Sequence, residues 1–143
     1  MLKGIDPILN ADVLYALRAM GHGDDLVIAD ANFPAETMAT GRLIRMDGVT
    51  SPRLLDAVLS LMPLDEFVDE PAGRIEVVGD ADAVPEVCAE MQDVIGRHEP
   101  NVTLAKIDRF DFYDRARKAF AVIATGEPRL YGCVILKMGV IRP

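Results

Sequence analysis

The residues best suited to chemistry lie between positions 21 and 34. His22 stands between two glycines, and Asp30 follows directly after the apolar residues 26–29. Imidazole titrates near neutral pH and can give or accept a proton, and glycines let a loop approach a ligand closely. His22 is therefore a candidate acid/base. The alternative is a loop histidine that is hydrogen-bonded to the backbone.

Asp30 is a candidate because of its place at the end of a predicted strand. The apolar run 26–29, bounded by Gly and Pro, is typical of a short buried strand. In open α/β sheets ligands gather outside strand ends, although a turn aspartate that stabilises residues 31–34 is an equal alternative. His22 and Asp30 then lie at opposite ends of one strand, unless the glycines fold the first loop back.

A second group of candidates is cationic and aromatic. Arg109 and Tyr113 lie within five positions of each other, and Tyr131 follows between two apolar segments. Together with His and Asp, and without a metal or nucleotide motif, these residue types suit recognition of a neutral polyol, whose hydroxyls they hydrogen-bond. The alternatives are that Arg109 neutralises nearby acids and that both tyrosines are surface aromatics. The pattern points weakly to a carbohydrate.

Charge and motifs argue against several other classes. The formal net charge is -8 and the pI is about 4.7, so a nucleic acid is a poor partner. Neither G-x-G-x-x-G nor G-x-x-x-x-G-K-[ST] occurs, which leaves nucleotide binding without support. Cys88 and Cys133 have no metal-site spacing. We expect no metal and no cofactor, and we interpret His98 as a surface residue at a helix end.

The same features predict where the protein works. Two isolated thiols suit a reducing compartment. The N-terminus lacks an apolar core of signal-peptide length, and no window approaches about 18 apolar residues. We therefore expect a cytoplasmic protein without a membrane partner.

The elements that must position these residues alternate along the chain. Helices are predicted from Asn10 to Gly21, from Ser51 to Pro63 and from Pro85 to His98. Strands are predicted at residues 26–29, 42–48, 74–79, 102–107, 119–125 and 130–137, the last paired antiparallel with its predecessor. Residues 64–73 read as a solvated acidic loop, and 108–118 as loop and short helix. This order predicts one α/β domain, residues 1–143, with a largely parallel sheet and an antiparallel edge.

Taken together, these segments resemble the L-fucose mutarotase and D-ribose pyranase family of small sugar-anomer enzymes. The resemblance covers essentially the whole chain and is closer to the fucose branch. Its most specific motifs are Met20-Gly-His-Gly-Asp, Asp30-Ala-Asn-Phe-Pro, Arg109-Phe-Asp-Phe-Tyr-Asp-Arg-Ala and Thr125-Gly-Glu.

The resemblance implies a three-layer α/β/α sandwich that assembles into rings, typically decamers, with each sugar site at a contact between subunits. It implies interconversion of the α and β anomers of L-fucose without a cofactor, or of pyranose and furanose rings in the ribose branch. His22 is implied as the proton donor, with Tyr113 sharing in proton transfer. The residues implied to contact or line the sugar site are Asp30, Asp65, Arg109, Tyr131 and Cys133.

Two positions depart from the family pattern. Asn32 stands where the family commonly has a histidine, and Cys133 where it has an asparagine. Asn32 can still hydrogen-bond, whereas Cys133 lacks the strong amide donor and acceptor, so that only its backbone is left to contact sugar. A non-catalytic sugar-binding accessory protein of an uptake system would use the same pocket and is the competing interpretation. A purely structural ring former would bind no sugar.

Overall fold

The computed structural model describes all residues from 1 to 143 and contains six strands in one mixed sheet. The strands are β1 (Asp25–Ala29), β2 (Arg42–Met46), β3 (Ala72–Ile75), β4 (Ala105–Ile107), β5 (Ala121–Thr125) and β6 (Val134–Lys137). Their order across the sheet is β2-β5-β1-β6-β3-β4. β2, β5 and β1 pair in parallel, as do β3 and β4, and β6 joins the two groups.

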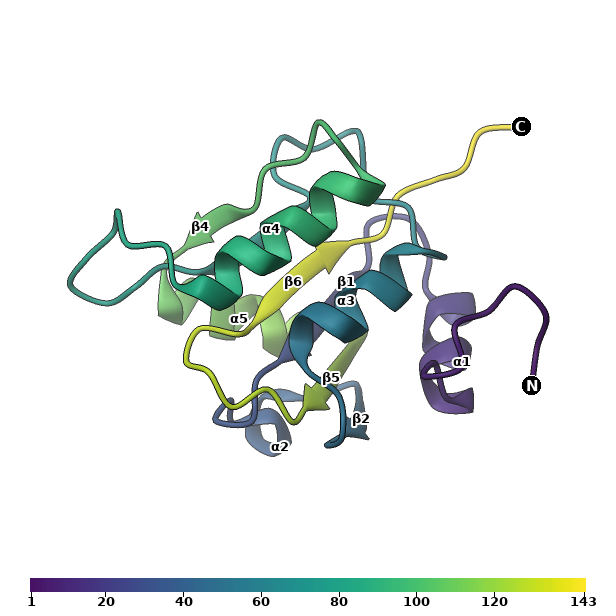
Figure 1. Ribbon diagram of the computed structural model, residues 1–143, viewed down its shortest axis with the longest axis horizontal. Coiled ribbons are helices and arrows are strands. Elements are labelled where there is room, and N and C mark those ends of the chain that lie inside the picture. Colours follow the sequence, from purple (N-terminus) through teal and green to yellow (C-terminus); the bar gives the residue numbers. More distant parts are fainter.

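Helices cover both faces of the sheet, as Figure 1 shows. They are α1 (Ala11–Ala19), α2 (Ala35–Met38), α3 (Ser51–Leu59), α4 (Glu86–His98) and α5 (Arg109–Lys118). The side chains of α1, α3 and α4 enter one apolar cluster, and those of α2 and α5 enter a second cluster on the other face. The expected three-layer α/β/α sandwich is confirmed.

The single antiparallel strand corrects one expectation. β6 lies in the interior of the sheet, antiparallel to both β1 and β3, and neither forms an edge nor pairs with β5. The reason is that both sides of β5 are occupied by β1 and β2. A hairpin between the last two strands is therefore not available.

Burial of β1 explains its unbroken apolar sequence. Leu26 and Ile28 point into the cluster under α3 and α4, whereas Val27 and Ala29 point into the cluster over α5. A strand covered on both faces needs apolar side chains at every position. The predicted buried strand at residues 26–29 is confirmed.

Local capping accounts for two helix starts. The Asn10 side chain accepts a hydrogen bond from the Val13 backbone N–H at 2.9 Å, as expected for the cap of α1. Asp108 does the same for α5 by accepting from the N–H groups of Phe110 and Asp111. This second cap makes residues 109–118 one ten-residue helix, where loop and short helix were expected.

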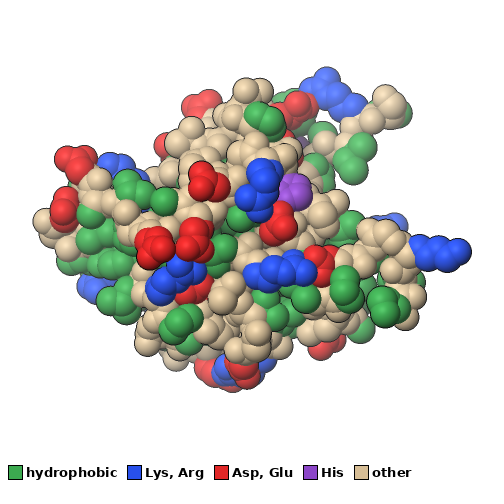
Figure 2. All heavy atoms as spheres, in the orientation of Figure 1, with side chains coloured by type: hydrophobic (Ala, Val, Ile, Leu, Met, Phe, Trp, Pro, Cys, Tyr) green, Lys and Arg blue, Asp and Glu red, His purple; other side chains and the backbone are tan.

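The directions of the strands distinguish two opposite edges of the sheet, one at either end of the strands. All strands except β6 run the same way, so their carboxyl ends, together with the start of β6, meet at what we call the carboxyl edge. The opposite side is the amino edge. Acidic and basic side chains are interspersed on the face that Figure 2 shows. No helix combines the length and apolar composition needed to cross a membrane.

Candidate functional site

A cavity of about 210 Å³ lies at the carboxyl edge. It is bounded by the loop after β1, the loop after β3, the start of α5 and the loop before β6. Five of the seven residues that the sequence singled out line this cavity: Asp30, Arg109, Tyr113, Tyr131 and Cys133. The structure therefore brings most of the predicted site together from segments far apart in the chain.

Asp30 is buried and held by both of its carboxylate oxygens. Oδ1 accepts from the Asn32 N–H at 2.9 Å, which is the turn contact that the sequence offered as an alternative. Oδ2 accepts from the Gly132 N–H at 3.1 Å and from the Cys133 thiol at 3.3 Å. Asp30 thus both stabilises its own turn and connects the loop after β1 to the loop before β6.

The Cys133 side chain is bonded to Asp30. Its sulfur also accepts from the Asp30 backbone N–H at 3.3 Å, and the residue is only 1% exposed. Burial, followed by the nearby Asp30 carboxylate, raises the pKa of the Cys133 thiol well above its ordinary value. The thiol is therefore a neutral hydrogen-bond donor that helps to hold Asp30 in place.

Arg109 and Tyr113 are presented by successive turns of the α5 start. The Arg109 side chain is exposed, lies 4.8 Å from the centre of the Phe110 ring and takes part in no ion pair within the chain. Tyr113 packs edge-to-face against Phe33, with ring centres 5.5 Å apart. The Arg109 guanidinium therefore does not neutralise a neighbouring acid within the chain.

Tyr131 has an uncommon backbone conformation. It is the only non-glycine residue with a positive φ, 65°, a region that costs a residue with a Cβ free energy and is often found at functional sites. The next residue must be glycine, because a Cβ on Gly132 would lie 2.6 Å from the Glu127 Cγ. The Tyr131 hydroxyl accepts from the Val78 N–H at 3.2 Å. Both ends of the tyrosine are therefore held at the cavity.

A buried ion pair supports this loop, and sequence reasoning missed it. The Glu127 side chain is fully buried, and its Oε1 lies 2.7 Å from the Arg129 Nε. Arg129 also donates hydrogen bonds to Glu90 of α4 through two nitrogens, at 2.7 and 3.0 Å. The Arg129 hydrogen bond lowers the pKa of Glu127 below its ordinary value. The Glu127 carbonyl accepts from the Ala31 N–H, so the pair links the loop before β6 to the residue after Asp30.

The remaining two predicted residues meet at the amino edge. The His22 Nε2 lies 3.1 Å from Asp65 Oδ1, and the His22 ring packs against Phe67 with centres 5.6 Å apart. The Asp65 carboxylate also accepts the Phe67 backbone N–H, and this bond, followed by that to His22, lowers the pKa of Asp65. Asp65 is only 3% exposed. This corrects the expectation that it lies in a solvated loop.

Strand β1 separates His22 from the carboxyl-edge cavity. The histidine precedes this five-residue strand and Asp30 follows it, and such a strand spans roughly 16 Å. The glycines do not fold the loop back toward Asp30. The two possibilities that the sequence left open are thereby resolved, and one chain does not bring His22 to the candidate residues that line the cavity.

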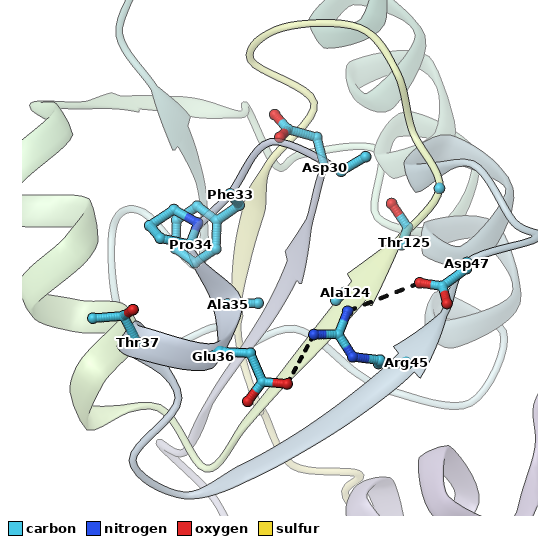
Figure 3. Close-up of a pocket in the computed structure, with 12 residues that line it drawn as sticks. Asp30, Phe33, Pro34, Ala35, Glu36, Thr37, Arg45, Asp47, Ala124 and Thr125 are labelled. Carbon is cyan, nitrogen blue, oxygen red and sulfur yellow. Dashed lines mark hydrogen bonds and ion pairs between the residues drawn. The ribbon is translucent and has the colours of Figure 1, made fainter.

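A second cavity, of about 360 Å³, adjoins the first at Asp30 and Phe33. Its charged groups are paired with one another, because Arg45 contacts Glu36 at 2.9 Å and Asp47 at 4.0 Å. Figure 3 shows this cluster on the floor of the cavity, with the Asp30 carboxylate directed away from it. The free polar groups thus belong to the smaller cavity.

The other histidine has a structural environment. The His98 Nε2 lies 2.8 Å from Asp56 Oδ1 of α3, at the end of α4. This contact is the largest cause of the lowered pKa of Asp56. The partner of His98 is thus a side chain of a neighbouring helix. The chain contains no cluster of three or more His, Cys, Asp or Glu side chains arranged to hold a metal ion.

Fold and cavity together define a small α/β protein with a cavity at the carboxyl edge of its sheet. Residues 3–141 match the model of the RbsD / FucU transport protein family. The human protein named fucose mutarotase is 48% identical, over 98% of this chain and 94% of its own length.

Solved structures agree with this match. The fucose mutarotase of Streptococcus pneumoniae in complex with L-fucose has a TM-score of 0.92 and 44% identity, covering 99% of this chain and 100% of the other. FucU from Bifidobacterium longum has a TM-score of 0.91 and 41% identity, covering 98% and 100%. The chain belongs to the RbsD / FucU family.

Proposed function

We propose that this protein is a mutarotase that interconverts the α and β anomers of L-fucose or a closely related aldose. The observation that carries the proposal is the carboxyl-edge cavity, where a buried carboxylate, an unpaired guanidinium and two tyrosines converge. Similarity along the whole chain to proteins named fucose mutarotase supports the same activity and favours L-fucose. The enzyme is then an isomerase acting on a carbohydrate.

The reaction needs two proton movements. A base removes the proton of the anomeric hydroxyl while an acid protonates the ring oxygen, so that the bond between C1 and the ring oxygen breaks and an open-chain aldehyde forms. The aldehyde rotates, and the reverse proton movements close the ring on the other face of C1. General acid/base groups each contribute about 100-fold to 10,000-fold, which suffices because uncatalysed mutarotation is already measurable.

In this proposal the cavity residues hold the sugar. Asp30 and Arg109 bind hydroxyls, because a carboxylate accepts and a guanidinium donates hydrogen bonds. Tyr131 covers an apolar part of the ring, and the Cys133 backbone contacts the sugar. Tyr113 is positioned to share in proton transfer through its hydroxyl.

His22 supplies the other proton from a second copy of the chain. Within one chain it lies at the opposite end of β1 from the cavity, so a site at a subunit contact is the arrangement that unites them. Asp65 orients His22 and contacts the sugar beside it. Exposed apolar side chains accompany both halves, since Phe67 lies beside His22 and Leu130 lines the cavity, at 62% and 66% exposure.

The proposal extends to assembly and location. We propose a homo-oligomeric ring, most specifically a decamer, because the family resemblance implies it. Half-sites that lie apart in one chain also require contacts between neighbouring copies of the chain. We also propose a cytoplasmic location. Both cysteines are free and buried, which suits a reducing compartment.

The test is anomer exchange measured by NMR saturation transfer on equilibrated L-fucose, with D-ribose alongside, at catalytic protein concentration. We expect faster α/β exchange for L-fucose than in buffer. Acceleration of pyranose/furanose exchange in D-ribose alone would instead identify the ribose-type activity. Saturable sugar binding without any acceleration would replace the enzyme with an accessory sugar-binding protein.

A further inference from the structure

A third cavity, of about 320 Å³, lies on the opposite face of β3 from the carboxyl-edge cavity, which we call the sugar cavity from here on. Ile75 faces the sugar cavity, whereas its neighbour Arg74 lines the third cavity together with Cys88 of α4. The volume is near the lower end of the range for small-molecule sites. The proposed mutarotation uses neither the cavity nor Arg74.

Arg74 is a buried cation without an anionic partner. It is only 4% exposed, and its hydrogen bonds go to two backbone carbonyls, those of Ile75 and Ala83, each at 3.2 Å. No carboxylate pairs with it, since it takes part in none of the ion pairs of the chain. Guanidinium stays charged at any ordinary pH, and an unpaired buried charge is strongly unfavourable. These two donated bonds use only two of the five N–H donors of the guanidinium.

A second cation stands at the mouth of the same cavity. The Lys106 ammonium donates to the Ala81 carbonyl at 2.8 Å and lies 3.9 Å from Asp82 Oδ1. Asp82 is fully exposed to solvent, so water screens its charge. The buried part of the cavity is therefore positive, in a chain whose formal net charge is -8.

We propose that this cavity binds a small oxyanion, either inorganic phosphate or the phosphate group of a small metabolite. Arg74 provides a planar fork that binds two oxygens of the group, and Lys106 provides a point charge at the entrance. The anion neutralises the buried guanidinium and takes the donors that the protein leaves free. The site is separate from the sugar cavity and does not depend on the proposed anomer exchange.

The test is a calorimetric titration of the full-length protein with inorganic phosphate, at constant ionic strength balanced with sodium chloride. Arg74→Met keeps an unbranched apolar stem and removes the charge, and it should weaken phosphate binding at least about tenfold. Lys106→Met alters an exposed residue and should weaken binding several-fold, which keeps the proposal testable if the first variant folds poorly. Arg45→Met, an exposed arginine in another cavity, is the matched control.

The outcomes separate cleanly. Saturable phosphate binding that falls in both site variants and persists in the control supports the site. A parallel titration with a hexose 1-phosphate then distinguishes the source, because tighter binding of the ester indicates a phosphorylated metabolite and equal binding indicates free phosphate. Equal phosphate binding by wild type and Arg74→Met, or no binding by the wild-type protein, would overturn the proposal.

Discussion

The carboxyl and amino edges of the sheet hold their candidate residues in different ways. At the carboxyl edge, Asp30 is bonded to the loop that carries Tyr131, and the Glu127–Arg129 pair supports that loop from below. At the amino edge, His22 stands in a glycine loop with its side chain 46% exposed and hydrogen-bonded to Asp65 alone. Contacts within one chain thus hold Asp30 and Tyr131 at the carboxyl edge, whereas the His22 side chain at the amino edge is presented outward.

This difference suggests a division of labour between copies of the chain. A binding cavity must keep its shape between substrates, so its polar groups are held by contacts inside the same chain. An acid/base residue needs access to a ligand that another surface carries. Substitutions at each edge test this division, and the largest effect is expected for His22.

The first prediction removes the proton donor. His22→Ala should lower the acceleration of L-fucose anomer exchange by about 100-fold or more, while sugar binding persists because the cavity is unchanged. Saturation-transfer NMR measures the exchange rate, and the shift of the thermal unfolding temperature on addition of L-fucose measures sugar binding. His98→Ala is the matched control, since that imidazole contacts Asp56, which belongs to neither half-site, and it should leave the exchange rate unchanged. Wild-type exchange in His22→Ala would end the assignment.

The second prediction tests whether the two edges meet between chains. His22→Ala and Arg109→Ala should each be slow alone, and both side chains are largely exposed. Co-expressed in equal amounts with different tags, they should form mixed rings with about a quarter of wild-type activity, because one site in four receives both intact side chains. Purification through both tags followed by exchange measurements checks this. If mixing restores nothing, each site takes both residues from one chain.

The third prediction concerns the support of the carboxyl edge. Glu127→Gln should lower the free energy of unfolding at neutral pH by about 1–3 kcal/mol, an amount limited by the partial exposure of Arg129. Because folding lowers the pKa of Glu127 from its ordinary value of 4.5, its contribution is present above pH 4.5 and is lost as the pH falls through the lower folded value. Urea unfolding at several pH values should therefore show a gap between wild type and variant that narrows in acid.

The exposed pair of Glu36 and Arg45 is the control for this prediction. Both side chains are more than half exposed, so water screens the pair and Glu36→Gln should change the free energy of unfolding far less than Glu127→Gln at any pH. A gap for Glu127→Gln that stays constant from neutral to acidic pH would show that its charge does not stabilise the fold.

The smallest expected effect concerns the Cys133 contact with Asp30. Cys133→Ala removes both hydrogen bonds that the sulfur makes to Asp30 and should raise the KM for L-fucose about threefold to tenfold. Cys133→Ser can form both bonds again and should stay close to wild type. Steady-state exchange rates at several sugar concentrations separate the variants. Equal KM values in both variants would mean that the thiol does not position Asp30.

Much of the fold could be predicted because the relevant signals are local. The apolar run of β1 and the cap at Asn10 each depend on a few neighbouring residues, and both are confirmed. The place of β6 could not be predicted, because it depends on which strand edges remain free after β1, β2 and β5 have paired. Its partners are far away in the chain.

The candidate site was predictable only in part, because some of its contacts join residues that are far apart in the chain. The family resemblance identified residue types, but whether His22 lies near Asp30 depends on the three-dimensional path of the chain. Burial of charged residues was missed altogether at Glu127 and Arg74, since a charged side chain in a turn or a strand end is normally exposed. Only the assembled structure reveals the partners that bury them.

The interior position of β6 also determines when this protein can finish folding. The three-stranded group β2-β5-β1 and the pair β3-β4 contact each other within the sheet only through this last strand. Until Val134–Lys137 pair with β1 and β3, each of the two groups has an unpaired strand edge. A chain in which β6 is not yet paired therefore exposes two unpaired strand edges, and such edges can pair with other chains and cause aggregation.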